Sequence, residues 1–326
     1  MSNGIGDGIR QLCDRPWQRA RARGCMLGQF CGDALGGLVE FQSSDQIRSE
    51  YPNGVRNMAD GGPFNTIAGQ PTDDSEMALM LARSLVADAG FDRGKVRRRY
   101  REWLESGPFD CGNTIWKGLS GERNFESQAN GALMRISPLG IFGAGRNLDD
   151  VAEWARQDAS ITHPNPVCQQ ANALFAMAIA TAVGQGIDGK SLHDAIVSWA
   201  VELNVDPALR KVVEAVDQEP WINRTVSKAG WVLVALQNAM WQLVNAPDLE
   251  AAIIDTANRG GDSDTNAAIC GALLGSVYGI DALPERWVNT VLNCRPEAGK
   301  AGVRQPRPEK FWPVDAMKLA DELLAV

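Results

Sequence analysis

The sequence predicts an all-α protein that folds as one compact domain. Apolar side chains recur at the three- and four-residue spacing of a buried helix face, most clearly over residues 168–182 and 232–243. No series of alternating apolar and polar residues indicates strands, and no strand–helix alternation appears. The 326 residues, 44% of them hydrophobic, are enough for a large core, and no linker or low-complexity segment divides them.

Helices are expected wherever this spacing holds, with polar segments containing Gly and Pro as their connections. Residues 43–71 and 109–113 are predicted to be ordered loops. Residues 1–21 are interpreted as an N-terminal extension that borders the functional cleft, and residues 22–326 as the helical domain. The predicted helices cover about residues 17–38, 75–89, 93–104, 148–160, 168–182, 192–202, 232–243, 249–256, 263–278 and 314–324.

Composition narrows the functional classes. The formal net charge of −8 argues against a broad nucleic-acid surface, although bound cations reverse the local field for an anionic substrate. The longest apolar run, about residues 267–280, is too short to cross a bilayer of about 30 Å. The N-terminus lacks a signal-peptide pattern, and seven cysteines without a CxxC pair indicate reduced core thiols. We expect a cytoplasmic protein without nucleic-acid or membrane partners.

Two predicted helices carry glycines spaced four residues apart, so that small residues line one helix face. Glycine in a helix interior costs up to about 1 kcal/mol relative to alanine. We interpret both faces as sites where a neighbouring backbone packs closely. The glycines are Gly28, Gly32 and Gly36 in the first helix, and Gly271, Gly275 and Gly279 in the second.

Two acidic clusters each lie where a loop runs into a predicted helix. For either cluster alone, helix capping is the simpler interpretation, because Thr and Asp are favoured caps and acids in the first turn complement the helix dipole. The clusters are Pro71-Thr72-Asp73-Asp74-Ser75-Glu76 and Gly260-Gly261-Asp262-Ser263-Asp264-Thr265.

Considered together, the clusters favour a metal site. A cap needs one acceptor, whereas these segments supply several carboxylates and two threonine hydroxyls, and Asp33 and Glu40 add two further acids beside the first glycine face. Such a concentration of negative charge is repulsive unless cations compensate it. Oxygen ligands suit Mg²⁺, Mn²⁺ or Ca²⁺, and the absence of neighbouring His or Cys ligands argues against Zn²⁺.

Five blocks, in this order, resemble the signatures of the ADP-ribosylglycohydrolase family, and within it the bacterial dinitrogenase-reductase-activating type. They are residues 24–40 (GCMLGQFCGDALGGLVE), 71–76 (PTDDSE), 130–138 (NGALMRISP), 162–164 (THP) and 260–279 (GGDSDTNAAICGALLGSVYG). The resemblance implies a compact, orthogonal helical bundle with a binuclear metal cleft that holds two Mg²⁺ or Mn²⁺ ions.

The resemblance also implies roles for the acids and hydroxyls. Thr72, Asp73 and Asp74 would hold one metal ion, and Asp262 and Thr265 the other. Asp264 would bridge both ions, and Glu40 would reach the second. The catalytic set is then Glu40, Asp73, Asp74 and Asp264. Asp73, Asp74 or Glu40 would accept the proton of the attacking water, and we favour Glu40.

The substrate site is expected around a further set of residues. Asp110 and Gly112 match a loop that contacts the ribose, and Asp33 matches an acid that supports the metal shell. The full set is Asp33, Asp110, Gly112, Asn130, Gly131 and His163.

Some of these residues have simpler explanations. Asn130-Gly131 is also a frequent turn pair, and His163-Pro164 is also a plain helix entry. Arg135 is equally consistent with a buried ion pair and with a phosphate ligand.

The activity implied is metal-dependent hydrolysis of the bond between ADP-ribose and a protein side chain, most simply arginine. A ribosylated guanidinium departs as neutral guanidine, so no strong general acid is needed. The partner would be an ADP-ribosylated protein and the product ADP-ribose. Two alternatives are a non-catalytic ADP-ribose-binding or structural protein on this fold, and a two-metal phosphohydrolase that cuts the diphosphate.

Overall fold

The computed structural model describes residues 15–220 and 229–326, and within these ranges it contains helices and no strand. The all-α prediction is confirmed. The helices are α2 (Pro16–Gly36), α3 (Ser44–Glu50), α4 (Asp73–Asp88), α5 (Arg93–Glu105), α6 (Asn113–Ser120), α7 (Ser137–Phe142), α8 (Leu148–Ala159), α9 (Pro166–Gln185), α10 (Gly189–Glu202), α11 (Pro207–Glu214), α12 (Val232–Asn245), α13 (Leu249–Asn258), α14 (Ser263–Tyr278), α15 (Glu285–Leu292) and α16 (Ala316–Ala325).

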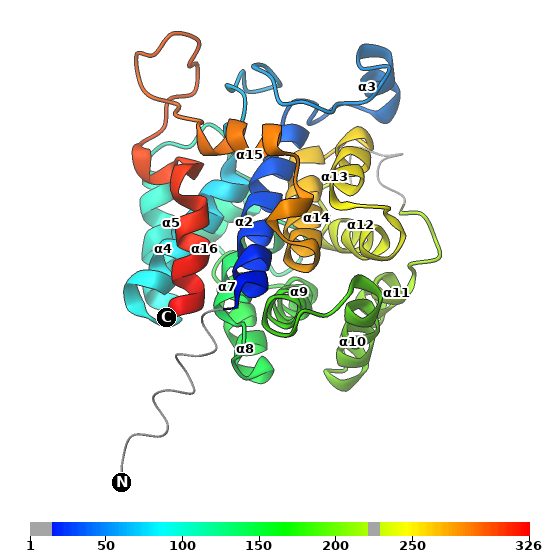
Figure 1. The fold of residues 1–326 in the computed structure, drawn as a ribbon. Helices are drawn as coiled ribbons and strands as arrows, with labels where there is room; N and C mark the ends of the chain where they lie inside the picture. The colour runs from blue at the N-terminus through cyan, green and yellow to red at the C-terminus, as the bar shows by residue number, and fades with distance from the viewer. Residues whose placement is uncertain (1–14, 221–228) are drawn as a thin grey trace.

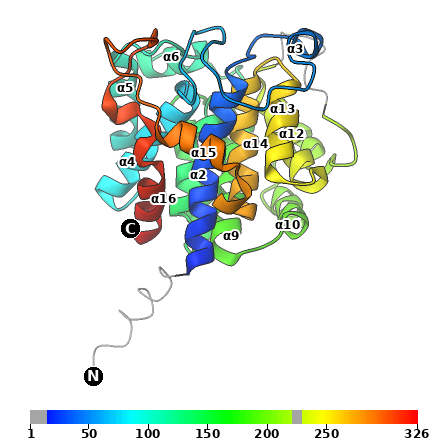
Figure 2. The same ribbon diagram turned by 45° about the horizontal axis from the view of Figure 1, so that its top comes forward.

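Helices α2 and α14 lie side by side at the centre of the fold, in opposite directions (Figures 1 and 2). A Cβ atom added to Gly28 would lie 2.2 Å from the carbonyl oxygen of Gly271, and one added to Gly32 would lie 2.1 Å from that of Ala267. No side chain larger than hydrogen fits at either position. The interpretation of the glycine faces as close backbone packing is confirmed.

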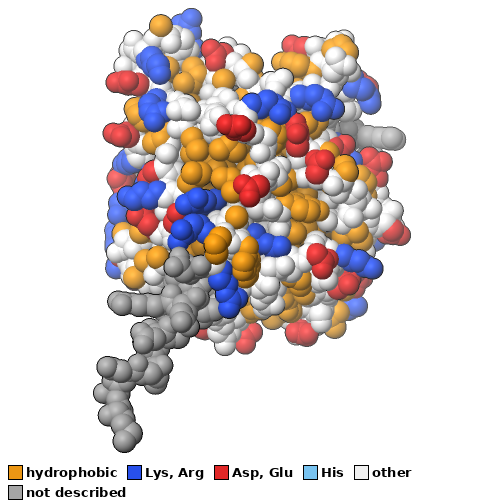
Figure 3. Space-filling view, viewed as in Figure 1, with side chains coloured by type: hydrophobic (Ala, Val, Ile, Leu, Met, Phe, Trp, Pro, Cys, Tyr) orange, Lys and Arg blue, Asp and Glu red, His pale blue; other side chains and the backbone are white. Residues whose placement is uncertain are grey.

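The other helices surround this pair. In Figure 1, α16 and α4 lie on one side of α2, and α12 and α13 lie on the far side of α14. Helix α9 is apolar and long enough to cross a membrane by length and composition, and 83% of its most apolar window is buried inside the protein. Such burial is typical of a core helix. On the face shown in Figure 3, acidic and basic side chains are interspersed around apolar ones.

Five short helices were not predicted. Helix α3 lies within residues 43–71, so the prediction of a loop over that whole segment is wrong. It buries one side chain, Ile47, and depends on a capping box between Ser43 and Gln46 instead of an apolar stripe. Helices α6, α7, α11 and α15 have only six to eight residues, too few for a periodic pattern to stand out.

The first described helix begins inside the segment interpreted as an N-terminal extension. Residues 16–21 form the first turns of α2, where Arg21 donates hydrogen bonds to the carbonyl oxygens of Ala182, Gly186 and Ile187. Residues 1–14 lie outside the described part of the chain.

Candidate metal centre and adjoining cavity

A cavity of about 440 Å³ opens where the C-terminal end of α2 meets the N-terminal ends of α4 and α14. Its volume falls within the usual range of small-molecule sites. Ten predicted site residues line it: Glu40, Asp73, Asp110, Gly112, Asn130, Gly131, His163, Asp262, Asp264 and Thr265. The lining also includes Phe41, Cys111, Asn113, Thr114, Ile115, Ala129, Met134 and Gly230. Each of the five sequence blocks that resemble the family signatures therefore contributes at least one residue to the cavity.

The N-cap residues of the two acidic clusters do not cap their helices with side chains. Thr72 and Asp262 occupy the N-cap positions of α4 and α14, yet neither side chain accepts a capping hydrogen bond. The hydroxyl oxygen of Thr72 instead lies 3.0 Å from both Asp33 Oδ1 and Asp74 Oδ2. Capping by Thr72 and Asp262 therefore does not explain the two clusters, although acids do lie in the first turn of both helices.

Asp33 ties α4 to α2. Its carboxylate accepts hydrogen bonds from the backbone N–H and the hydroxyl of Thr72, and from the same two groups of Ser75, at 2.6 to 3.1 Å. Burial raises the pKa of Asp33 to about 6, and these four bonds oppose that rise. Asp33 thus fixes the first turn of α4 against the central helix.

The neighbouring carboxyl groups strongly disfavour one another's charge. Burial is the main cause that raises the pKa of Asp73, Asp74 and Asp264 well above their ordinary values, and adjacent carboxylates add to it. The same causes raise the pKa of Glu40 to about 10 and that of Asp110 to about 6. No lysine or arginine is among the described residues that line the cavity. Protons or cations must therefore compensate the charge.

The donor set fits divalent cations. Oxygen atoms of Asp33, Asp74 and Asp264 lie within 4.8 Å of one another, and so do those of Glu40, Asp110 and Asp264. Asp264 belongs to both groups. Two buried oxygens, Glu40 Oε2 and Asp74 Oδ1, have no hydrogen-bond partner, as expected for atoms that await a ligand. An all-oxygen set of this kind suits Mg²⁺ or Mn²⁺.

Other predicted ligands lie beside these two groups. Asp73 accepts a hydrogen bond from the backbone N–H of Gly112 at 3.4 Å, and Asp262 accepts one from Asn130 Nδ2 at 2.6 Å. Thr265 Oγ1 lies 3.5 Å from Asp74 Oδ2. Asp33 and Asp110, which were expected to support the metal shell and contact the ribose, lie within the carboxylate groups themselves.

Another part of the cavity wall includes Gly131 and the polar side chains of Asn130 and His163. A Cβ atom added to Gly131 would lie 2.9 Å from Ile115 Cδ1 and 3.2 Å from His163 Cε1, so only glycine leaves this wall undistorted. Burial and the charge of Arg135 lower the pKa of His163 to about 3, and its ring is therefore neutral. Arg135 itself does not line the cavity. It forms a fully buried ion pair with Asp158, which decides between its two interpretations.

The chain matches the family model described as ADP-ribosylglycohydrolase over residues 14–324. The protein belongs to the ADP-ribosylglycohydrolase family. It is 30% identical to the ADP-ribosyl-[dinitrogen reductase] glycohydrolase of Rhodospirillum rubrum, over 82% of this chain and 89% of the relative. It is 29% identical to the ADP-ribosylarginine hydrolase Tri1 of Pseudomonas putida strain GB-1, over 83% of this chain and 74% of the relative.

Solved structures agree with the sequence relatives. An ADP-ribosylglycohydrolase-related protein complex superposes with a TM-score of 0.77 and 28% sequence identity, covering 95% of this chain and 99% of that one. The family's orthogonal helical bundle is therefore the fold of this chain as well. The carboxylate groups described above lie within the region that the family model matches.

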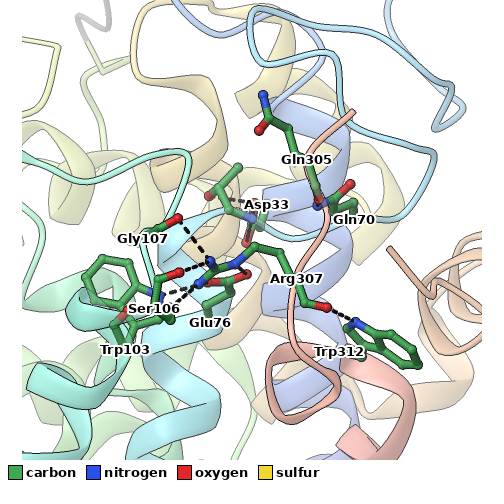
Figure 4. A network of polar contacts seen from close by, with 10 residues as sticks. Asp33, Gln70, Glu76, Trp103, Ser106, Gly107, Gln305, Arg307 and Trp312 are labelled. Atoms are coloured by element: carbon green, nitrogen blue, oxygen red, sulfur yellow. Dashed lines mark hydrogen bonds and ion pairs between the residues drawn. The ribbon is translucent and has the colours of Figure 1, made fainter. Parts of the chain in front are cut away.

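A buried ion pair that the sequence did not reveal holds the first part of α4 in place. The guanidinium of Arg307 binds both carboxylate oxygens of Glu76 at 2.8 Å and donates to Ser106 and Gly107 (Figure 4). Trp103 Nε1 donates to the same carboxylate at 2.7 Å. Glu76 follows the first cluster on α4, whereas Arg307 lies in a proline-rich loop without a periodic pattern, so no local signal connects them.

An aromatic residue in the cavity lining, and two more packed beyond it, were also missed. Phe41, with 60% of its surface exposed, lines the cavity and has a positive φ of 67°. Phe64 lies between it and Phe109, with ring centroids 6.2 and 5.5 Å away. Cys111 corrects another expectation: it lies half-buried in the cavity wall, although the cysteines were predicted to be core thiols.

Proposed function

We propose that the protein hydrolyses the N-glycosidic bond between ADP-ribose and an arginine side chain of a protein. The observation that carries the proposal is one cavity lined by five carboxylates, of which Glu40 has an unpaired oxygen, together with Asn130, Gly131 and His163. Relatives named as an ADP-ribosyl-dinitrogen-reductase glycohydrolase and an ADP-ribosylarginine hydrolase support the same reaction. Free cysteines among the described residues support a reducing, cytoplasmic location.

The proposal includes two Mg²⁺ or Mn²⁺ ions. When bound, they would supply Lewis acidity that orients the ribose hydroxyls and activates water. The residues that would hold them are Thr72, Asp73 and Asp74 for one ion, Asp262, Thr265 and Glu40 for the other, and Asp264 for both. Asp33 would hold the first turn of α4 in place for this ligation.

Glu40 is the proposed acceptor of the water proton. It lies on the turn after α2, lines the cavity and leaves Oε2 without a partner, whereas Asp74 is buried behind the lining. Asp110 and Gly112 lie on the loop before α6, where they would contact the ribose and orient its anomeric carbon. As the bond breaks, that carbon develops oxocarbenium character, which nearby carboxylates stabilise.

Leaving-group chemistry favours arginine. A ribosylated guanidinium carries a proton already and departs as neutral guanidine. A serine linkage would leave as an alkoxide and would require a proton donor. Every carboxyl group that lines the cavity is already assigned above, either as a metal ligand or, for Asp110, as a ribose contact, so none is left to serve as an independent acid. The relative named as an ADP-ribosylarginine hydrolase supports this choice.

Mass spectrometry of the products tests the reaction. The purified protein in Mg²⁺ is incubated with arginine-modified and serine-modified peptides under identical conditions. Release of intact ADP-ribose from the arginine substrate is the expected result. A tenfold preference for the serine substrate, about 1.4 kcal/mol in the barrier, would overturn the linkage and leave the glycohydrolase class intact.

Two other outcomes identify the alternatives. AMP as the product would indicate a phosphohydrolase that cuts the diphosphate. Binding of ADP-ribose without turnover of either peptide would indicate a non-catalytic binder. Asp264→Asn should abolish turnover, whereas Asp194→Asn, which neutralises an exposed carboxylate on α10, should not change it.

A further inference from the structure

A buried network behind the cavity runs from α5 and α8 to His163. Arg135 Nε donates to Asp158 Oδ2 at 3.1 Å, and its Nη2 donates to the Asp158 carbonyl oxygen at 3.1 Å. Tyr100 donates its hydroxyl proton to Asp158 Oδ1 at 2.7 Å and places its ring 4.4 Å from the guanidinium. Arg135, Asp158 and Tyr100 are completely buried, so this arrangement has little freedom to rearrange.

Thr162 connects that network to His163. Its hydroxyl oxygen accepts a hydrogen bond from Arg135 Nη1 at 2.9 Å and lies 2.8 Å from His163 Nδ1. A guanidinium only donates, so Arg135 cannot accept the hydroxyl proton of Thr162. Thr162 is buried, and Nδ1 is the remaining partner in hydrogen-bond range among the described residues. The hydroxyl proton finds an acceptor here only if it points at Nδ1 and Nδ1 is the unprotonated ring nitrogen.

The opposite nitrogen of this ring then carries the proton. His163 Nε2 is fully buried and has no hydrogen-bond partner, while the residue lines the cavity. An unpaired N–H in such a place is unfavourable until an acceptor arrives. The ring stays uncharged, because its pKa is lowered to about 3.

We propose that Arg135 and Thr162 act as positioning residues that hold His163 as the Nε2–H tautomer, ready to donate to an acceptor oxygen of the bound nucleotide. Because Thr162 Oγ1 accepts a hydrogen bond from Arg135, its own hydroxyl proton is left to be donated to His163 Nδ1. The identity of the ligand rests on the proposed function, whereas the tautomer follows from the protein alone. His163 thereby discriminates acceptors from donors at its point of contact without carrying a positive charge.

Nitrogen-15 NMR of the imidazole rings tests the tautomer. The chain has two histidines, and loss of one signal set in His193→Gln assigns the other to His163. In Mg²⁺-loaded protein at neutral pH, Nε2 should be protonated and Nδ1 unprotonated. Thr162→Ser keeps the hydroxyl and should retain this pattern, whereas Thr162→Val should mix the tautomers. Thr181→Val, which removes an unpartnered buried hydroxyl on α9, is the matched control and should change nothing at His163.

Protonated Nδ1 in the wild type, or an unchanged pattern in Thr162→Val, would overturn the inference. Calorimetric titration with ADP-ribose tests the ligand. His163→Phe should weaken binding by about tenfold, the factor expected for one hydrogen bond to a charged acceptor. Thr162→Val should weaken binding less, by about twofold, because part of its population keeps the Nε2–H tautomer. Wild-type affinity in His163→Phe would refute the nucleotide contact. So would a failure of the wild-type protein itself to bind ADP-ribose. The ligand-free spectra would still decide the tautomer, and neither measurement depends on turnover.

Discussion

Replacing Arg307 with methionine should destabilise the protein far more than removing an ordinary surface ion pair. The side chains of Arg307 and Glu76 are 3% and 2% exposed, and the guanidinium contacts both carboxylate oxygens at 2.8 Å (Figure 4). Methionine fills much of the same volume but leaves Glu76 buried with only Trp103 as a donor. Breaking a buried pair from one side costs about 3–5 kcal/mol.

That magnitude converts into a measurable shift. With an unfolding entropy of about 2.1 cal/mol/K per residue, a chain of 326 residues loses about 1.5 °C of melting temperature per kcal/mol. Arg307→Met should therefore lower Tm by about 4–7 °C in differential scanning calorimetry. The matched control is Arg83→Met, which removes a similarly bidentate pair with Asp315 whose side chains are 25% and 33% exposed. That pair is worth at most about 1 kcal/mol.

The pH dependence of stability provides a second check on Arg307→Met. Burial already raises the pKa of Glu76, and Arg307 is the largest opposing influence. Without Arg307 that pKa rises further, so folded Glu76 retains a proton that the unfolded chain releases. The stability of the variant should therefore fall as pH rises from about 5 towards the raised pKa. Adding Glu76→Gln should recover part of the loss, and a Tm drop of 1 °C or less for Arg307→Met alone would refute the reasoning.

Three further predictions concern the acidic groups. Mg²⁺ or Mn²⁺ should raise Tm and EDTA should abolish turnover, and full activity in metal-free buffer would contradict the two-ion proposal. Asp264→Asn should lose turnover and at least one bound ion by elemental analysis while its circular dichroism stays helical; normal metal content with normal turnover would contradict it. In EDTA, stability should decrease from pH 6 to 9, because Glu40 has a pKa near 10 when folded and an ordinary value of 4.5 when unfolded. Denaturant unfolding across that range measures the slope, which saturating Mg²⁺ should flatten, and stability that rises with pH in EDTA would contradict the assignment.

The sequence predicted long helices well and short ones poorly for a physical reason. Helices α9 and α14 bury most of their residues in one hydrophobic core, so their apolar content spans many turns. Helix α3 instead gains its stability from Ser43 and Gln46, whose capping bonds leave no periodic trace. Short amphipathic segments such as α11 and α15 bury two side chains each, too few to distinguish a helix from a loop.

Most residues of the candidate site could be predicted, chiefly from the family resemblance, but their arrangement in space could not. Two acidic clusters signalled cations, but their separation in sequence concealed how they combine. Asp33 binds Thr72 and Ser75 across about forty positions, and Asp110 joins Glu40 and Asp264 through a loop that carries no metal signature of its own. Such contacts depend on how helices cross, and a single sequence does not specify the crossing.

The close packing at the glycine faces is therefore what brings the acidic clusters together. Because α2 and α14 run in opposite directions, their contact brings the end of one helix to the start of the other. A Cβ atom added to Gly36 would lie 2.6 Å from the backbone nitrogen of Asp264, so this last glycine directly sets how near Asp264 comes to α2. Asp33 lies one turn earlier on α2, and its carboxylate falls within 4.8 Å of those of Asp264 and Asp74. Larger residues at these glycine positions would push α2 and α14 apart and separate the carboxylate oxygens that would bind cations. The helix propensity lost at the glycines is thus the local cost of gathering buried carboxylates, and bound cations would offset the repulsion that this gathering creates.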